Sequence, residues 1–129
     1  MESESKSRSY TILIAEDETL VLKMLSYRLQ KEGYNVLTAS DGKQAMECLR
    51  TSTPDLVITD LMMPYHNGLE VLEYVKKSLG NCIPVIVLSA SGQEPTVLKA
   101  FSLGADDFAL KPFSPNELVH RVRKHLGIA

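Results

Sequence analysis

The chain has 129 residues, of which 44% are hydrophobic and 23% are charged, and its formal net charge is −2. This length and balance are typical of one globular domain that buries a core without disulfides, and they exclude a fibrous or disordered protein. The small negative charge gives no electrostatic reason to expect direct binding to nucleic acid or to an anionic membrane.

The sequence shows no membrane or export signal. No apolar run reaches the ~18 residues of a transmembrane helix, and Met1–Ser9 lacks the apolar centre of a signal peptide. We therefore expect a cytoplasmic protein with a mobile, serine-rich tail at residues 1–9 and one folded domain at residues 10–129. Cys48 and Cys82 match no metal-binding spacing and are expected to be free thiols.

The first half of the domain alternates short apolar runs with amphipathic stretches. These patterns predict a strand at Thr11–Ala15, a helix at about Thr19–Glu32, a strand at Asn35–Ala39, a helix at about Asp41–Arg50 and a buried strand that ends at Asp60. In the first helix we expect one stripe to face the core, made of Leu20, Val21, Met24, Leu25 and Leu29.

The second half continues the same alternation. A helix follows from about Leu69 and ends at Gly80, then come a strand at Pro84–Ser89, a helix at about Glu94–Leu103, a strand at Asp107–Leu110 and a last helix from Ser114 to Leu126. In the helix from Glu94, we expect Val97, Leu98 and Phe101 to face inward. Ser114 and Glu117 predict a capping box with Pro115 in the first helical position.

Alternating strands and helices predict a parallel sheet with helices on both faces. Five strands are too few for a closed barrel, so we expect an open, doubly wound, flavodoxin-like α/β sheet in the order 2-1-3-4-5. This order makes the first and third strands neighbours. Glu16 and Asp17 from one strand end would then meet Asp60 from the other.

These three carboxylates repel one another, and a bound cation relieves that repulsion. Mg²⁺ suits the site because it prefers oxygen ligands and combines a few carboxylates with a phosphate oxygen. Asp60 could then attack phosphorus and form an acyl phosphate. Ser89 and Lys111, which end the next two strands, supply a hydroxyl and a positive charge for phosphoryl oxygens.

With these features the sequence resembles the receiver domain of two-component response regulators, from about Tyr10 to Leu126. The matching segments are ILIAEDE at residues 12–18, SDG at 40–42, PDLVITDLMMP at 54–64 with Gly68, LSA at 88–90 and GADDFALKP at 104–112. Each segment alone is weak evidence, but together, in this order and spacing, they are highly specific.

The resemblance implies a phosphorylation-controlled signalling switch. Asp60 would be the phosphoacceptor, and Glu16, Asp17 and the backbone carbonyl of Met62 would hold Mg²⁺ beside it. Lys111 would pair with the phosphoryl group. The resemblance also implies a cis peptide bond between Lys111 and Pro112, which turns the chain and aims the lysine inward.

The resemblance also names two switch residues, the Ser89 hydroxyl and the Phe108 ring. This sequence departs from the commoner pattern at Glu16, where Asp is usual, at Ser89, where Thr is frequent, and at Phe108, where Tyr is frequent. Because Phe108 has no hydroxyl, any rotation of its ring must act through packing.

The resemblance further implies the partners. The phosphoryl donor would be a histidine kinase or a histidine phosphotransfer protein, and a downstream protein would bind the face formed by residues of about 94–126. We expect no output domain in this chain and no enzymatic activity beyond phosphorylation and dephosphorylation of its own Asp60.

Other functions remain open from the sequence. An Asp-dependent phosphatase would need a second acid two residues after Asp60, where Met62 stands. A flavodoxin-type cofactor carrier would need hydroxyls or glycines after the first strand, where the chain is acidic. A receiver-like module that is never phosphorylated is a third alternative. His66, His120 and His125 are expected to be surface residues, and Arg121, Arg123 and Lys124 a solvated or partner-binding face.

Overall fold

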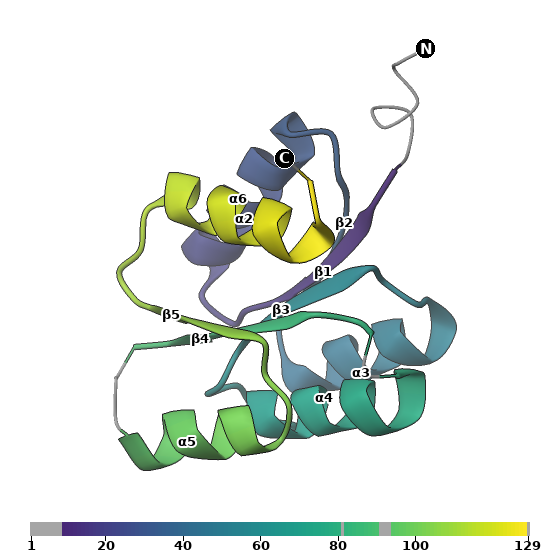
Figure 1. Cartoon of the computed structure of the whole chain (residues 1–129), viewed down its shortest axis with the longest axis vertical. Coiled ribbons are helices and arrows are strands. Elements are labelled where there is room, and N and C mark those ends of the chain that lie inside the picture. The colour runs from purple at the N-terminus through teal and green to yellow at the C-terminus, as the bar shows by residue number, and fades with distance from the viewer. Residues whose placement is uncertain (1–8, 81, 91–93, 129) are drawn as a thin grey trace.

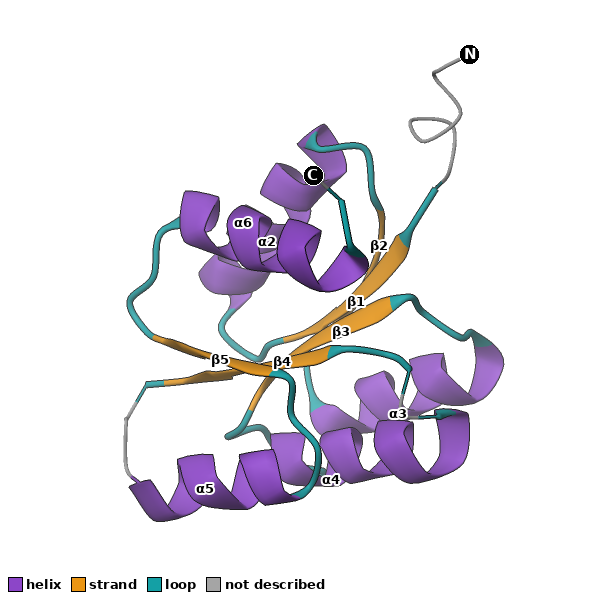
Figure 2. Ribbon diagram, in the orientation of Figure 1, coloured by secondary structure: helices purple, strands orange, loops and turns teal. Residues whose placement is uncertain are grey.

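The computed structural model describes residues 9–80, 82–90 and 94–128, which form three layers with one sheet in the middle. Most of the tail predicted at residues 1–9 lies outside the described residues. Figures 1 and 2 show helices α2 and α6 on one face of the sheet and α3, α4 and α5 on the other.

The sheet has the predicted topology. Its strands are β1 (Thr11–Ala15), β2 (Asn35–Ala39), β3 (Leu56–Asp60), β4 (Val85–Ser89) and β5 (Asp107–Leu110), all parallel, in the order β2-β1-β3-β4-β5. In the register, Asp60 lies opposite Leu88, and Ser89 lies opposite Leu110. The carboxyl ends of β1, β3, β4 and β5 therefore meet along one edge, as predicted.

The helices also agree with the prediction to within a few residues at their ends. They are α2 (Thr19–Lys31), α3 (Gly42–Thr51), α4 (Gly68–Tyr74), α5 (Glu94–Ser102) and α6 (Pro115–Leu126). The predicted helix that ends at Gly80 is α4 continued by a π-helical segment, η1 (Val75–Leu79). Among the described residues no helix combines the length and the apolar character needed to span a membrane.

Both faces of the sheet are buried, which explains why its central strands are continuously apolar. Alternate residues of the strands point to opposite faces, so Leu13 and Val57 pack toward α3, α4 and α5, whereas Ile12 and Ile58 pack toward α2 and α6. Each fully buried side chain of this size contributes about 1.5–3 kcal/mol of hydrophobic free energy. The two cores hold the sheet, and with it the strand ends, in a fixed register.

Side-chain caps fix where several helices begin. Asp41 accepts a hydrogen bond from the backbone of Gln44 at the start of α3. Ser114 accepts one from the backbone of Glu117 at the start of α6, 3.1 Å away. The predicted capping box at Ser114 is only half formed, because the Glu117 carboxylate binds Arg121 instead.

Four apolar residues predicted to face the core are exposed instead. Leu20 and Met24 of α2 are 82% and 37% exposed, and Leu98 and Phe101 of α5 are 61% and 44% exposed. The apolar stripes of these helices are wider than the surface they share with the sheet. Among the described side chains of α5, Ala100 alone is buried, in the core cluster that also contains Val85 and Val87 of β4.

Candidate functional site

The predicted acids converge at the carboxyl edge of the sheet. Glu16 follows β1 and is fully buried, whereas Asp60 ends β3 and is 5% exposed. Asp17 is exposed at the rim. Carboxylate oxygens of Glu16, Asp17 and Asp60 all lie within 4.8 Å of one another, so the sequence-based expectation that these acids meet is confirmed.

The side chain of Asp60 is held from two sides. Its Oδ1 atom accepts a hydrogen bond from the backbone of Met62 at 3.1 Å, and its Oδ2 atom accepts one from Lys111 Nζ at 3.0 Å. The direction of the aspartate carboxylate is therefore fixed at the end of β3.

Lys111 reaches this site from β5. Its backbone donates to the Ser89 carbonyl at 2.8 Å, which continues the pairing of β4 and β5 by one residue. The peptide bond between Lys111 and Pro112 is cis, as predicted. The ammonium group contacts Glu16 at 2.9 Å and Glu18 at 3.3 Å as well as Asp60.

Burial and these contacts shift the pKa values of Glu16 and Lys111. Burial of Glu16 raises its pKa to about 7, although the attraction to Lys111 opposes this. Burial would lower the pKa of Lys111, but its attraction to the Glu16 and Asp60 carboxylates outweighs that effect and raises it. Lys111 therefore remains protonated at neutral pH and offsets part of the negative charge around Asp60.

One buried carboxylate oxygen of this cluster, Glu16 Oε1, lacks a hydrogen bond among the described residues. Glu16 Oε2 accepts a hydrogen bond from the backbone of Glu18 at 2.9 Å, whereas Glu16 Oε1 accepts no well-directed hydrogen bond within the part of the chain that the structure describes. Lys111 approaches Oε1 as an ion pair, off the hydrogen-bonding direction. A buried carboxylate oxygen in this condition, with two further carboxylates beside it, fits the oxygen ligand set of a divalent cation.

Two glycines allow the loop after β3 to lie against the site. A Cβ atom on Gly68 would overlap the backbone carbonyl of Asp60, and a Cβ atom on Gly42 would overlap the carbonyl of His66. The backbone of Gly68 donates to Leu61 at 2.9 Å, and that of Gly42 donates to Pro64 at 3.1 Å. The segment that carries Met62 therefore has little freedom relative to Asp60.

The remaining predicted residues lie near the site in different ways. Ser89 is 5% exposed and ends β4 at the same edge. Phe108 is half-buried and packs on the core under α5. The sequence did not single out Glu18, the third acid of the run at residues 16–18, although its contact with Lys111 makes it part of the cluster.

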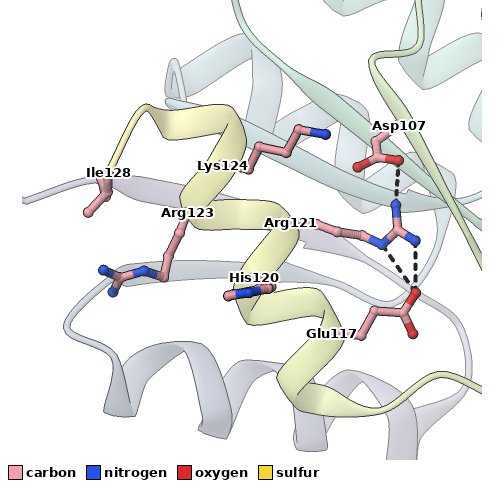
Figure 3. A pocket seen from close by; sticks show the side chains of 7 residues that line it. All are labelled: Asp107, Glu117, His120, Arg121, Arg123, Lys124 and Ile128. Carbon is pink, nitrogen blue, oxygen red and sulfur yellow. Dashed lines mark hydrogen bonds and ion pairs between the residues drawn. The ribbon is translucent and has the colours of Figure 1, made fainter.

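A second charged cluster lies outside this site, along α6. Arg121 binds Asp107 of β5 at 2.6 Å and Glu117 at 2.8 Å, as Figure 3 shows. His125, expected to be a surface residue, is only 17% exposed, and its Nε2 atom lies 2.9 Å from the other oxygen of Asp107. Burial alone would raise the pKa of Asp107, but its bonds to His125 and Arg121 lower it. A depression of about 670 Å³ runs past this cluster and includes none of the acids around Asp60.

Comparison with known proteins gives a consistent result. A family model described as the response regulator receiver domain matches residues 12–123. The alkaline phosphatase synthesis transcriptional regulatory protein PhoP of Bacillus subtilis is 38% identical over 87% of this chain, and the probable transcriptional regulator ycf27 of Guillardia theta is 42% identical over 87%. The chain spans only 46% and 43% of the lengths of these two relatives.

Solved structures agree with the sequence relatives. The receiver domain of the Francisella response regulator 1452 has a TM-score of 0.84 and 31% identity, over 92% of this chain and 97% of that one. The BeF₃-activated receiver domain of DrrB from Thermotoga maritima has a TM-score of 0.84 and 30% identity, over 93% of this chain and 99% of that one. Together with the topology and the acidic strand ends, these matches show that the chain belongs to the response regulator receiver domain family of two-component systems.

Proposed function

We propose that this chain is a phosphorylation switch that accepts a phosphoryl group on Asp60. The observation that carries the proposal is the position of the Asp60 carboxylate, which is nearly buried, aimed by the Met62 backbone and Lys111, and surrounded by Glu16 and Asp17. This arrangement suits nucleophilic attack on phosphorus better than a structural role, because a structural aspartate does not need two further acids within reach.

In the proposed reaction a carboxylate oxygen of Asp60 forms a bond to phosphorus while the bond between phosphorus and a histidine nitrogen of the donor breaks. The imidazole leaves with the electron pair, and Asp60 becomes an acyl phosphate. The ammonium group of Lys111 lies 3.0 Å from Asp60 before the reaction and would then pair with the new phosphoryl oxygens. The Ser89 hydroxyl, at the end of the neighbouring strand, donates to another of them.

Mg²⁺ is the proposed cofactor, held by Glu16, Asp17, Asp60 and the Met62 carbonyl. When bound, Mg²⁺ neutralises charge on the carboxylates and on the phosphoryl oxygens. The buried Oε1 atom of Glu16, which lacks a well-directed hydrogen bond among the described residues, supports this assignment.

The proposed phosphoryl donor is a histidine kinase or a histidine phosphotransfer protein, and the proposed readout is a downstream protein that binds the α5–β5–α6 face. That face, at residues of about 94–126, exposes Leu98, Phe101 and Leu110 at 61%, 44% and 48%. Three large apolar side chains exposed on this face support the proposal that a protein binds there. Phe108 lies on β5 of the same face and could transmit the change from Ser89.

Intact-mass measurement tests the proposal directly. Incubation with acetyl phosphate and Mg²⁺ should add one phosphoryl group to the parent chain and none to Asp60→Asn. Asp41→Asn is the matched control, because Asn caps a helix as well as Asp does and Asp41 lies outside the acid cluster. Full labelling of Asp60→Asn would move the nucleophile elsewhere, and an unlabelled parent chain would favour a receiver-like module that is never phosphorylated.

A further inference from the structure

Tyr65, in the loop between β3 and α4, has a backbone conformation that tyrosine seldom adopts. Its φ is 72°, and it is the one residue other than glycine with a positive φ in the ranges 9–80, 82–90 and 94–128. This left-handed conformation places Cβ close to the next carbonyl oxygen and costs an L-residue about 1–2 kcal/mol, whereas glycine adopts it freely.

The flanking residues impose this conformation whatever side chain stands at position 65. On one side, the Pro64 carbonyl accepts a hydrogen bond from Gly42 at 3.1 Å. On the other side, the His66 backbone packs so tightly on Gly42 that a Cβ atom there would overlap it. Asn67 then caps α4 through reciprocal hydrogen bonds with Glu70, at 2.9 and 3.0 Å.

No contact of the Tyr65 ring with the described residues offsets this cost. Its side chain is 77% exposed, and it makes no hydrogen bond, ion pair or ring contact with any residue that the structure describes. Met62 of the same loop is 72% exposed. Glycine would adopt this conformation without cost, so a tyrosine with its ring in solvent at the rim of a functional site points to a contact made outside the chain.

The position of the loop indicates what that contact is. Asp60 is only 5% exposed, so a protein that delivers a phosphoryl group must bring its reacting side chain into the carboxyl edge and cover the rim. Met62 and Tyr65 stand two and five residues after Asp60, in a loop whose two ends are fixed against the site. A donor that reaches Asp60 therefore meets this loop.

The charges of the rim indicate the chemistry of the donor surface. Glu16, Asp17, Glu18 and Asp60 surround the single ammonium group of Lys111, so this edge is negative. A complementary surface carries basic side chains, and a tyrosine ring binds both apolar groups and cations on its face. Tyrosine is also among the residues that dominate binding energy at protein interfaces.

We propose that Tyr65, supported by Met62, is a specificity-determining contact for the protein that carries the phosphohistidine, through a donor surface with basic and apolar side chains. The inference rests on the proposed function, since it assumes that Asp60 receives a phosphoryl group from a protein. It assigns to Tyr65 no part in the chemical step, which small phosphodonors also use.

The experiment compares two donors on the parent chain, Tyr65→Gly, Tyr65→Asn and Tyr65→Phe. Acetyl phosphate with Mg²⁺ should label all four at rates within about twofold, since the ring points to solvent. Transfer from a purified, autophosphorylated histidine kinase is measured as kcat/KM, with the kinase chosen from a panel as the one fastest on the parent chain. Here Tyr65→Gly and Tyr65→Asn should be slower by about tenfold and Tyr65→Phe close to the parent, because Phe keeps the ring.

Two controls separate binding from folding. Tyr27→Gln removes a ring of similar exposure, 63%, from the second half of α2 and should leave kinase transfer unchanged. Urea unfolding should show Tyr65→Gly to be at least as stable as the parent, because glycine relieves the left-handed conformation.

Each remaining outcome overturns a specific part of the inference. Equal kinase transfer in all variants, or no transfer to the parent from any kinase of the panel, removes the donor contact. A loss of acetyl phosphate labelling in Tyr65→Gly alone places the ring inside the chemistry instead. A parent dimer that Tyr65→Gly dissociates in sedimentation shows that a second copy of the chain covers the loop. Failure of acetyl phosphate to label the parent itself refutes the proposed function and is recognisable as such.

Discussion

Glu16 should make the free energy of unfolding of the metal-free chain fall as the pH rises from about 5 to 7.5. Its side chain is fully buried, and this burial raises its pKa from 4.5 to about 7. In the unfolded chain the same carboxyl group is solvated and titrates near its ordinary value. Between the two values the folded state holds a proton that the unfolded state has already released, so a rise in pH favours unfolding. The stabilisation that Glu16 contributes is fully present below its unfolded-state pKa of 4.5 and is lost as the pH rises through its folded-state pKa of about 7.

The structure sets the size of the effect. A pKa of about 7 in the folded chain against 4.5 in the unfolded chain corresponds to about 3 kcal/mol. Lys111 lies 2.9 Å from the Glu16 carboxylate and favours its ionised form, so we expect a smaller loss of about 1–2 kcal/mol. Glu16→Gln has no titratable group at position 16. Between pH 5 and 7.5 its free energy of unfolding should therefore fall by about 1–2 kcal/mol less than that of the parent. Mg²⁺ prefers the ionised carboxylate and at pH 7.5 should stabilise the parent more than the variant.

Urea unfolding in EDTA at several values between pH 5 and 7.5 measures this dependence. Glu70→Gln is the control, because it removes an exposed carboxylate while Gln preserves the capping box with Asn67. The parent and Glu70→Gln should show the same slope of unfolding free energy against pH, and Glu16→Gln a flatter one. Parallel slopes for the parent and Glu16→Gln would refute the reasoning.

Three further predictions concern other parts of the chain. Gly68→Ala should lower stability by at least about 2 kcal/mol in urea unfolding, because its Cβ would overlap the carbonyl at the end of β3, and a loss below about 0.5 kcal/mol would contradict this. Asp106→Asn should lower stability by about 2 kcal/mol, because Lys76, whose side chain is 7% exposed, loses the carboxylate 2.8 Å away. Adding Lys76→Met should recover part of that loss, and strictly additive losses would argue against the pair. Ser89→Ala should still be labelled but should weaken the amide-signal response of residues 108–121 to beryllofluoride, and an equal response in both chains would rule out the coupling.

The sequence predicted the architecture well because the features that determine it are local. Continuous apolar runs at residues such as Leu56–Ile58 identify strands covered on both faces, and their alternation with amphipathic stretches leaves few topologies. In a parallel sheet the carboxyl ends of the strands share one edge, so strand assignments alone predicted that Glu16 and Asp60 would meet. The site followed from the topology.

What the sequence did not predict depends on details of packing. The apolar stripe of α2 does not reveal that Leu20 and Met24 lie beyond the surface that the helix shares with the sheet. His125 looked isolated because its partner, Asp107, lies 18 residues away on β5. The positive φ of Tyr65 is also hidden, since the tight packing of Gly42 against the loop imposes it, and neither residue signals that contact in the sequence.

Overall composition hides the main electrostatic feature of this chain, which is where its negative charge lies. When ionised, Glu16, Asp17, Glu18 and Asp60 together with Lys111 carry −3, so the rest of a chain with a net charge of −2 carries +1. The net negative charge of the chain therefore comes from this edge of the sheet, where the Lys111 ammonium group contacts three of the four carboxylates. A phosphoryl group would add further negative charge at the same point, which Lys111 alone does not balance. The electrostatics thus favour a cation at this edge in the proposed reaction, and a basic surface on the protein that delivers the phosphoryl group.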